Sequence, residues 1–234
     1  MAQSPARAWR IVLEKIETDL LDGGLGPGDH LPPERELAAQ LGVGRSSVRE
    51  ALRVLDVLGL IRTATGSGPS AGAIVIATPR GGMSALLRLQ VAAQGFPIDD
   101  VVRTRVILES AVVETLATVR APLVEAITML DAMDDTSLTP AEFLALDAEF
   151  HLALAEASGN AVVAATMAGL RTAIESYVLQ GAERIADWDA TAIGLRTQHR
   201  QIVAAIQSGD AAGSRAGITD HITGYYAHTG LTRH

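Results

Sequence analysis

The sequence predicts a mainly α-helical protein in which a small β-hairpin separates an N-terminal group of helices from a C-terminal antiparallel bundle of six or seven helices. Three observations support this prediction. Residues 32–61 contain two short helical segments joined by a turn of a few residues. Two short β-like runs around a glycine-rich stretch follow them. From Met83 onward there is no alternating strand pattern, and glycine, proline and asparagine separate long helical segments.

Length and composition set the broad class. A chain of 234 residues with 48% apolar residues is long enough for two globular domains, which we expect at residues 1–80 and 81–234. It has no cysteine, and therefore neither a disulfide framework nor a thiolate metal site. It shows no uncharged apolar run of about 18 residues and no secretory signal pattern. We therefore expect a cytoplasmic protein without a membrane span.

The net charge of −8 is unevenly distributed. Residues 1–80 hold nine Arg and Lys and nine Asp and Glu, whereas residues 81–234 hold ten and eighteen. The acidity therefore belongs to the C-terminal part. A neutral N-terminal part still suits DNA if its arginines are clustered, with binding that depends strongly on salt.

The N-terminal helices follow from apolar periodicity. Arg7–Leu21 predicts an amphipathic helix, and the glycines and prolines of residues 25–33 predict a loop. Glu34–Leu41 predicts a second helix that ends at Gly42, a residue suited to a left-handed cap. The third helix, Arg45–Leu58, places its apolar side chains on one arc and its arginines on the opposite one, namely Arg45, Arg49 and Arg53.

Two short helices with a tight turn and exposed arginines have the geometry that places a helix in the DNA major groove. An ordinary helical hairpin with a solvated basic face explains the spacing equally well. After Ile61, the runs Arg62–Ala64 and Ala73–Ala77 flank TGSGPSAG and predict a hairpin.

The residues themselves favour the first reading. PPERELA, RSSVREALR and LGLI, within residues 8–78, resemble the N-terminal winged helix-turn-helix domain of the GntR family of bacterial transcription regulators. The resemblance implies that Arg35, Arg45 and Arg49 contact DNA, with Ser46 and Ser47 as phosphate or base neighbours. The hairpin would be the wing. It departs from the family pattern because no basic residue lies between Arg62 and Arg80, so any wing contact would use backbone N–H groups such as that of Gly66.

In the C-terminal part, polar residues that face the interior are the informative signal. The helix predicted for Pro140–Ala157, with a capping box at Thr139-Pro140-Ala141-Glu142, has Asp147 and His151 in the middle of its apolar arc. Their spacing of four stacks the two side chains. The same reading places His199 and His221 inward on two further helices.

Each histidine taken singly is more simply a core imidazole that is hydrogen-bonded to a neighbour. As a set, Asp147, His151, His199 and His221 form a ligand set for a first-row divalent metal ion with no soft donor and with open coordination positions. We expect Zn or Ni, with Mn, Fe or Co as alternatives. His228 lies further along the face of His221 as a reserve ligand or second-layer partner.

The helix predicted for Ile98–Val119 also turns charged residues inward, because Arg105 and Glu109 lie on its apolar face. A self-satisfied pair within one helix is the plainer explanation. A bound anion explains a buried arginine better, since the guanidinium fork suits a carboxylate.

RVILE, DAEFH, ASGN, HRQIVAAIQSGD and DHI, within residues 83–228, resemble the effector-binding domain (FCD type) of the FadR-like branch of GntR regulators. The resemblance implies that Asp147, His151, His199 and His221 hold a metal and that a small organic acid completes its coordination. Arg105 would meet the acid's carboxylate, with Arg171 as a second candidate at the edge of its helix.

These readings predict a ligand-responsive transcription repressor that binds an inverted-repeat DNA operator as a homodimer. Two alternatives remain open at this stage. One is a metalloenzyme that activates water, with Glu109 as general base. The other is a sensor for which the metal itself is the signal, and a fully enclosed ligand set with no pocket would favour it.

Overall fold

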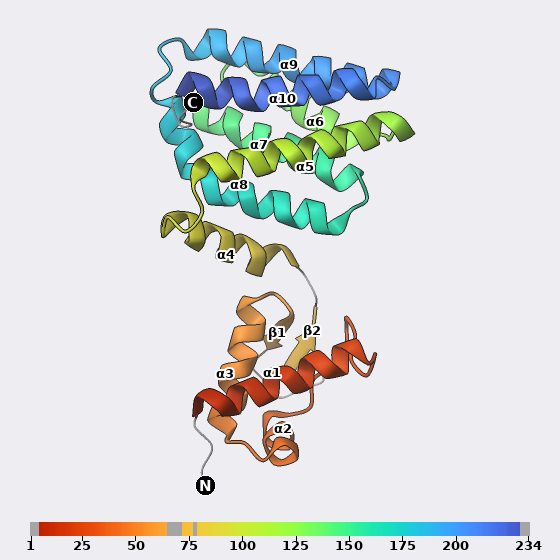
Figure 1. Ribbon diagram of the computed structural model, residues 1–234, viewed down its shortest axis with the longest axis vertical. Helices are drawn as coiled ribbons and strands as arrows, with labels where there is room; N and C mark the ends of the chain where they lie inside the picture. Colours follow the sequence, from red (N-terminus) through yellow and green to blue (C-terminus); the bar gives the residue numbers. More distant parts are fainter. Residues whose placement is uncertain (1–4, 65–71, 77–78, 230–234) are drawn as a thin grey trace. The chain divides into compact units, whose positions relative to one another are not determined.

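The structure, a computed structural model, describes residues 5–64, 72–76 and 79–229. It divides into two compact units, Met1–Met83 and Ser84–His234, and the division falls within helix α4 (Pro79–Ala92) (Figure 1).

The N-terminal unit contains three helices, α1 (Pro5–Leu21), α2 (Glu34–Leu41) and α3 (Arg45–Val57). Helix α2 ends at Gly42, whose φ of 63° is left-handed and therefore favours glycine. Only two further residues precede α3, and this is the predicted tight turn. The three helices share an apolar core whose fully buried members include Val12, Ile16, Val48, Ala51 and Ile61.

A two-stranded antiparallel hairpin completes this unit. Strand β1 (Ile61–Ala64) pairs with β2 (Gly72–Val75), with Ile61 opposite Val75. The other edge of β2 binds the loop before α2, because the N–H of Leu31 donates to the carbonyl of Ala73 at 2.8 Å. The predicted winged helix-turn-helix is confirmed. The tip of the hairpin, which includes Gly66, lies outside the described residues.

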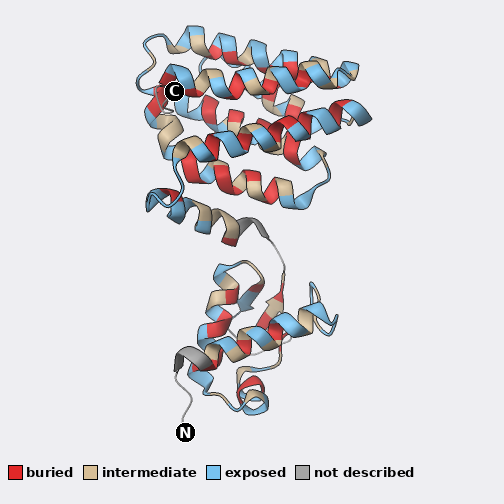
Figure 2. Ribbon diagram, in the orientation of Figure 1, coloured by how far each residue is buried: buried red, intermediate tan, exposed pale blue. Residues whose placement is uncertain are grey.

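The C-terminal unit consists of helices that run mostly antiparallel to their sequence neighbours (Figure 1). Helix α5 packs against α10, α9 against α10, and α7 against both α6 and α8. Most of their buried side chains form one large core, and Ala155, Ala164 and Met167 form a smaller cluster between α7 and α8 (Figure 2). The helices after α4 are α5 (Ile98–Val119), α6 (Val124–Met133), α7 (Pro140–Ala157), α8 (Ala161–Ala182), α9 (Trp188–Ser208) and α10 (Ala211–Thr229).

Side-chain caps begin four of these helices. The predicted capping box at Thr139 is present, since its side chain accepts from the N–H of Glu142 while the Glu142 carboxylate accepts from the N–H of Thr139. Asn160 caps α8 by accepting from Val162 and Val163. Asp187 caps α9 by accepting from the N–H of Ala190, and Asp210 caps α10 by accepting from the N–H of Gly213 at 2.8 Å.

Helix α8 is, among the described residues, the one helix long and apolar enough to cross a membrane by length and composition. One such helix is weak evidence, because the core helix of a globular bundle passes the same test. In this bundle α8 buries Ala164, Met167, Leu170 and Ile174 in contacts with its neighbours. Its apolar character therefore has a structural explanation within the folded protein.

Candidate functional site

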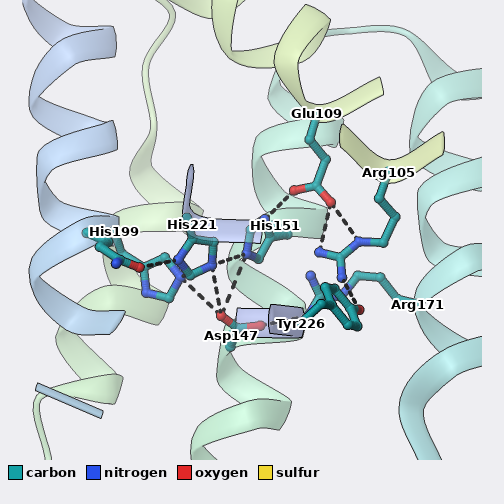
Figure 3. Close-up of polar contacts among 9 residues, drawn as sticks. Arg105, Glu109, Asp147, His151, Arg171, His199, His221 and Tyr226 are labelled. Atoms are coloured by element: carbon teal, nitrogen blue, oxygen red, sulfur yellow. Dashed lines mark hydrogen bonds and ion pairs between the residues drawn. The ribbon is translucent and has the colours of Figure 1, made fainter. Parts of the chain in front are cut away.

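Four potential metal ligands converge in the core of the C-terminal unit. Asp147 and His151 come from α7, His199 from α9 and His221 from α10 (Figure 3). All four are buried, with at most 9% of any of them exposed. The structure thus brings together the whole ligand set that the inward-facing pattern predicted.

The separations between the potential ligand atoms suit one metal ion. The Nε2 atom of His221 lies 3.2 Å from that of His151 and 3.1 Å from that of His199. The Oδ1 atom of Asp147 lies 3.0 to 3.7 Å from the three Nε2 atoms. Two ligands that are each about 2.1 Å from a metal ion are about 3.0 Å apart at a right angle and about 3.4 Å apart at the tetrahedral angle. The observed distances are therefore close to the edges of such a coordination polyhedron.

The proton positions on two imidazoles also point to a cation. Nδ1 of His151 donates to Oε2 of Glu109, and Nδ1 of His221 donates to Oε1 of Gln198 at 2.9 Å. A neutral imidazole with its proton on Nδ1 has a lone pair on Nε2. The lone pairs of His151 and His221 therefore face each other across 3.2 Å. This arrangement is repulsive unless a positive ion lies near both atoms, so the residues present fit a divalent metal ion.

His199 is held differently. Its ring packs against Phe150 with the ring centroids 4.6 Å apart. Its Nδ1 atom is buried and has no hydrogen-bond partner among the residues that the structure describes. Packing rather than a second hydrogen bond therefore orients this imidazole.

The pKa directions agree with a ligand set that is ready for a metal. Burial lowers the pKa of His221 to about 3, and burial also lowers the pKa of His199. Both imidazoles are therefore neutral, as metal binding requires. Burial by itself would raise the pKa of Asp147, but the polar imidazoles around the carboxylate, His151 foremost, lower it well below its ordinary value. This carboxylate is therefore ionised.

Glu109 connects the ligand set to Arg105. One carboxylate oxygen of Glu109 accepts from His151, and the other accepts from Nε and Nη2 of Arg105 at 2.9 and 2.8 Å. Nη1 of Arg105 donates to the hydroxyl of Tyr226 at 2.9 Å. Burial by itself would raise the pKa of Glu109, but the positive charge of Arg105 lowers it far below its ordinary value. Every guanidinium nitrogen of Arg105 thus already has a partner (Figure 3).

Arg171, on α8, has open donors instead. Its Nη2 atom donates to Oδ2 of Asp147 at 2.9 Å. Its Nε and Nη1 atoms are buried and have no hydrogen-bond partner among the described residues. Unpaired buried donors on a charged group are costly, so this guanidinium is prepared to bind an anion.

A small inner pocket lies beside the ligand set. Its volume is about 30 Å³, and its walls include Asp147, His151, His221, Arg171 and Tyr225. This exceeds the roughly 10–15 Å³ of such space that one water molecule needs, so the pocket takes a group of carboxylate size. A larger groove of about 340 Å³ between α7 and α8 shares Arg105 and Arg171 with it.

Other predicted or overlooked site residues lie as follows. His228 is exposed and bonds to the carbonyl of Gly224, away from the ligand set. The sequence reasoning missed Gln198 and Tyr226 and paired Glu109 only with Arg105. Gln198 lies on the exposed side of α9, so periodicity gives no signal for it.

The predicted DNA-reading residues lie in the N-terminal unit. Arg35 on α2 and Arg45, Ser46 and Arg49 on α3 are exposed. Ser47 is only 7% exposed and lies on the packed face of α3. The structure therefore brings the three arginines and Ser46 to the surface, whereas it places the Ser47 side chain in the interior.

Comparison with known protein families identifies both halves of the chain. Residues 10–69 match the family described as bacterial regulatory proteins, gntR family. Residues 100–224, more than half of the chain, match the FCD domain.

Individual proteins agree with these matches. The chain is 29% identical to a regulatory protein of Escherichia coli (strain K12) that is assigned by inference to the L-lactate dehydrogenase operon, over 98% of this chain and 88% of that protein. It is 29% identical to the HTH-type transcriptional repressor NanR of Edwardsiella tarda (strain FL6-60), over 93% of this chain and 83% of that protein. The solved structure described as Streptococcus agalactiae GntR superposes with a TM-score of 0.64 over 94% of this chain and 97% of that one, at 23% identity, and so shares the fold.

Gln198 provides a test of the metal site that leaves the core intact. We expect Gln198→Ala to weaken Zn²⁺ binding by about tenfold, because His221 loses the partner that orients its ring and fixes its proton on Nδ1. Competition with a chromophoric chelator measures the affinity.

The matched control is Gln201→Ala, which also removes an exposed glutamine from α9 but touches no ligand. Equal Zn²⁺ affinities for the two variants would contradict the role assigned to Gln198.

Proposed function

Because the chain belongs to the GntR family of bacterial regulatory proteins and carries an FCD domain, we propose that it is a repressor that binds an inverted-repeat operator as a homodimer and releases it on binding a small organic acid at a metal site. At the coarser level, the protein is a DNA-binding transcription regulator with an effector-binding domain. Such regulators act in the cytoplasm, where we place this protein as well.

One observation carries the effector part of the proposal: Arg171 has two buried, unpaired guanidinium nitrogens beside the metal-ligand set. The charges at the site support an anion. The carboxylates of Asp147 and Glu109 balance the guanidinium groups of Arg105 and Arg171, so a divalent ion adds two positive charges that the buried residues do not offset. A carboxylate reduces that excess.

Different residues would bind the metal, bind the acid and position the ligands. Asp147, His151, His199 and His221 would hold a divalent ion, Zn or Ni in preference to Mn, Fe or Co. When bound, the ion supplies open coordination positions for a carboxylate oxygen. Arg171 donates to the acid through Nε and Nη1, the atoms that lack partners. Arg105 contributes to the walls of the pocket and keeps Glu109 against His151.

Two other readings of the site have less support. A metalloenzyme would use Glu109 as general base, but this carboxylate is bound to Arg105 and to Nδ1 of His151, on the side of the ring away from the other ligands. A sensor of the metal alone would enclose its ligand set, whereas three members of this set, Asp147, His151 and His221, line a pocket that shares walls with a larger groove.

DNA recognition is assigned to Arg35, Arg45, Ser46 and Arg49. Binding as a two-fold symmetric dimer to an inverted repeat doubles the contacts of one short helix. Ser47 is less suited to DNA contact, because its side chain is buried and its N–H donates to the carbonyl of Gly44 at 3.0 Å. A wing contact through Gly66 stays a prediction, because that residue lies outside the described part of the chain.

The first experiment concerns DNA. We expect Arg45→Ala and Arg49→Ala each to lose about 1–3 kcal/mol of discrimination between operator and random DNA, because each arginine reads a guanine through two hydrogen bonds. The operator is first selected from a random DNA pool with wild-type protein, and competition binding at fixed salt then gives the discrimination.

Arg215→Ala is the control, since this exposed arginine lies on α10 and pairs with Glu114 at 3.5 Å. Unchanged discrimination in both α3 variants would show that α3 is not the reading helix.

The second experiment concerns the acid. We expect Arg171→Gln to raise the acid concentration that releases half of the operator by more than tenfold, since a charge-assisted hydrogen bond contributes about 1.5–3 kcal/mol. Affinity for DNA without acid should stay near that of wild type. The probe is the carboxylic acid that releases wild-type protein most effectively from the selected operator.

Arg184→Gln removes an exposed arginine just beyond the end of α8 and is the matched control. If Arg171→Gln released DNA at the wild-type acid concentration, Arg171 would be only a partner of Asp147, and the carboxylate would have to contact Arg105.

A further inference from the structure

The groove between α7 and α8 extends outward from the inner pocket. Its walls and those of the inner pocket share Arg105, Leu144, Arg171 and Val178, so the two spaces adjoin at the guanidinium groups. The inner pocket holds about 30 Å³ and the groove about 340 Å³. An acid whose carboxylate fills the inner pocket must therefore place the rest of its atoms in the groove.

Most of the groove is apolar. Small residues on α7 create the hollow, since Ala141, Ala145 and Ala148 leave room that a longer side chain would occupy. Hydroxyl groups of a ligand would lose water against these apolar walls. Among the described lining residues, the polar side chains they could meet are Thr172, Glu149, Glu175 and the two arginines. The remaining apolar lining residues are Leu144, Leu152, Ala168, Ile174, Val178 and Leu179.

The charges of the groove are ordered along its depth. Arg105 and Arg171, which also line the inner pocket, carry the positive charge at its inner end. Glu149 on α7 and Glu175 on α8 line the same groove but are exposed, so negative charge lies at its outer edge. A ligand with a second carboxylate at its far end would bring like charges together there.

We infer that the acid recognised by this site is a monocarboxylic acid with an uncharged, apolar tail that lies in the groove between α7 and α8. The volume of the groove is about 340 Å³, against about 30 Å³ for the inner pocket, so it accommodates a tail of several carbon atoms. The inference rests on the proposed function, because it takes the carboxylate site beside the metal ligands as given. Dicarboxylic acids and polyhydroxylated sugar acids are the classes that the groove disfavours.

The test uses a series of acids on the Zn²⁺-loaded full-length protein, with affinities from isothermal titration calorimetry. From acetate through butanoate and hexanoate to octanoate, we expect affinity to rise by up to about fourfold for each methylene that enters the groove. Hexanedioate and gluconate have the same chain length as hexanoate, and we expect both to bind at least about tenfold more weakly.

Two alanines on α7 provide matched variants. Ala145 and Ala157 are both exposed, but only Ala145 lines the groove. We expect Ala145→Leu to abolish most of the increase in affinity with acid chain length. Acetate should still bind within about twofold of its wild-type affinity. Ala157→Leu should behave as wild type. Because both sites are on the surface, neither change disturbs the core.

The outcomes separate this inference from the proposed function. Equal affinity for acetate and octanoate, or tighter binding of hexanedioate than of hexanoate, would overturn the inference and leave the acid site standing. Failure of every acid to bind the metal-loaded protein would overturn both. If Ala145→Leu changed the oligomeric state and left the chain-length series unaltered, the groove would be a protein interface instead.

Discussion

The central constraint on the C-terminal bundle is the repulsion between two imidazole lone pairs. Glu109 and Gln198 fix the protons of His151 and His221 on Nδ1, so that the two Nε2 atoms face each other across 3.2 Å, close to the carboxylate of Asp147. A cation at this point would replace the repulsion by attraction, and its ligands would come from α7, α9 and α10. Burial keeps the imidazoles neutral and so favours metal binding further, because protons and metal ions compete for the same imidazole nitrogen.

The same constraint explains why the bundle carries two arginines with different tasks. Arg105 is fully paired, and its bonds to Glu109 hold that carboxylate against His151. Arg171 donates one hydrogen bond to Asp147 through Nη2, whereas its Nε and Nη1 atoms have no partner among the described residues and could bind a ligand. In the proposed function, Asp147 would couple effector and metal, because it is a ligand candidate and also accepts from Arg171. The change in DNA affinity that an acid would cause cannot exceed the difference between the acid's affinities for the DNA-bound and the released states of the protein.

Much of this arrangement was predictable from the sequence, because buried positions recur along each helix with its period of about 3.6 residues. The pattern gave the bounds of α5 and α7 and turned Asp147, His151, His199 and His221 inward. The helical pattern does not predict contacts between side chains on different helices. Glu109 lies 42 residues from His151, Gln198 is exposed, and whether Arg105 or Arg171 retains free donors depends on neighbours from other helices. Ser47 shows the same limit, because packing against the N-terminal core places its side chain inside.

The proposed response to an acid requires a divalent ion at the centre of the bundle. The most direct measurement is native mass spectrometry of the protein purified without chelator, alongside a variant that combines His151→Ala with His199→Ala. We predict one divalent metal ion per chain in the unmutated protein and none in the variant, with a lower melting temperature for the variant because metal bound to the native state stabilises it by mass action. An unmutated protein that is fully folded, contains no divalent ion and gains none from added Zn²⁺ or Ni²⁺ would contradict the account.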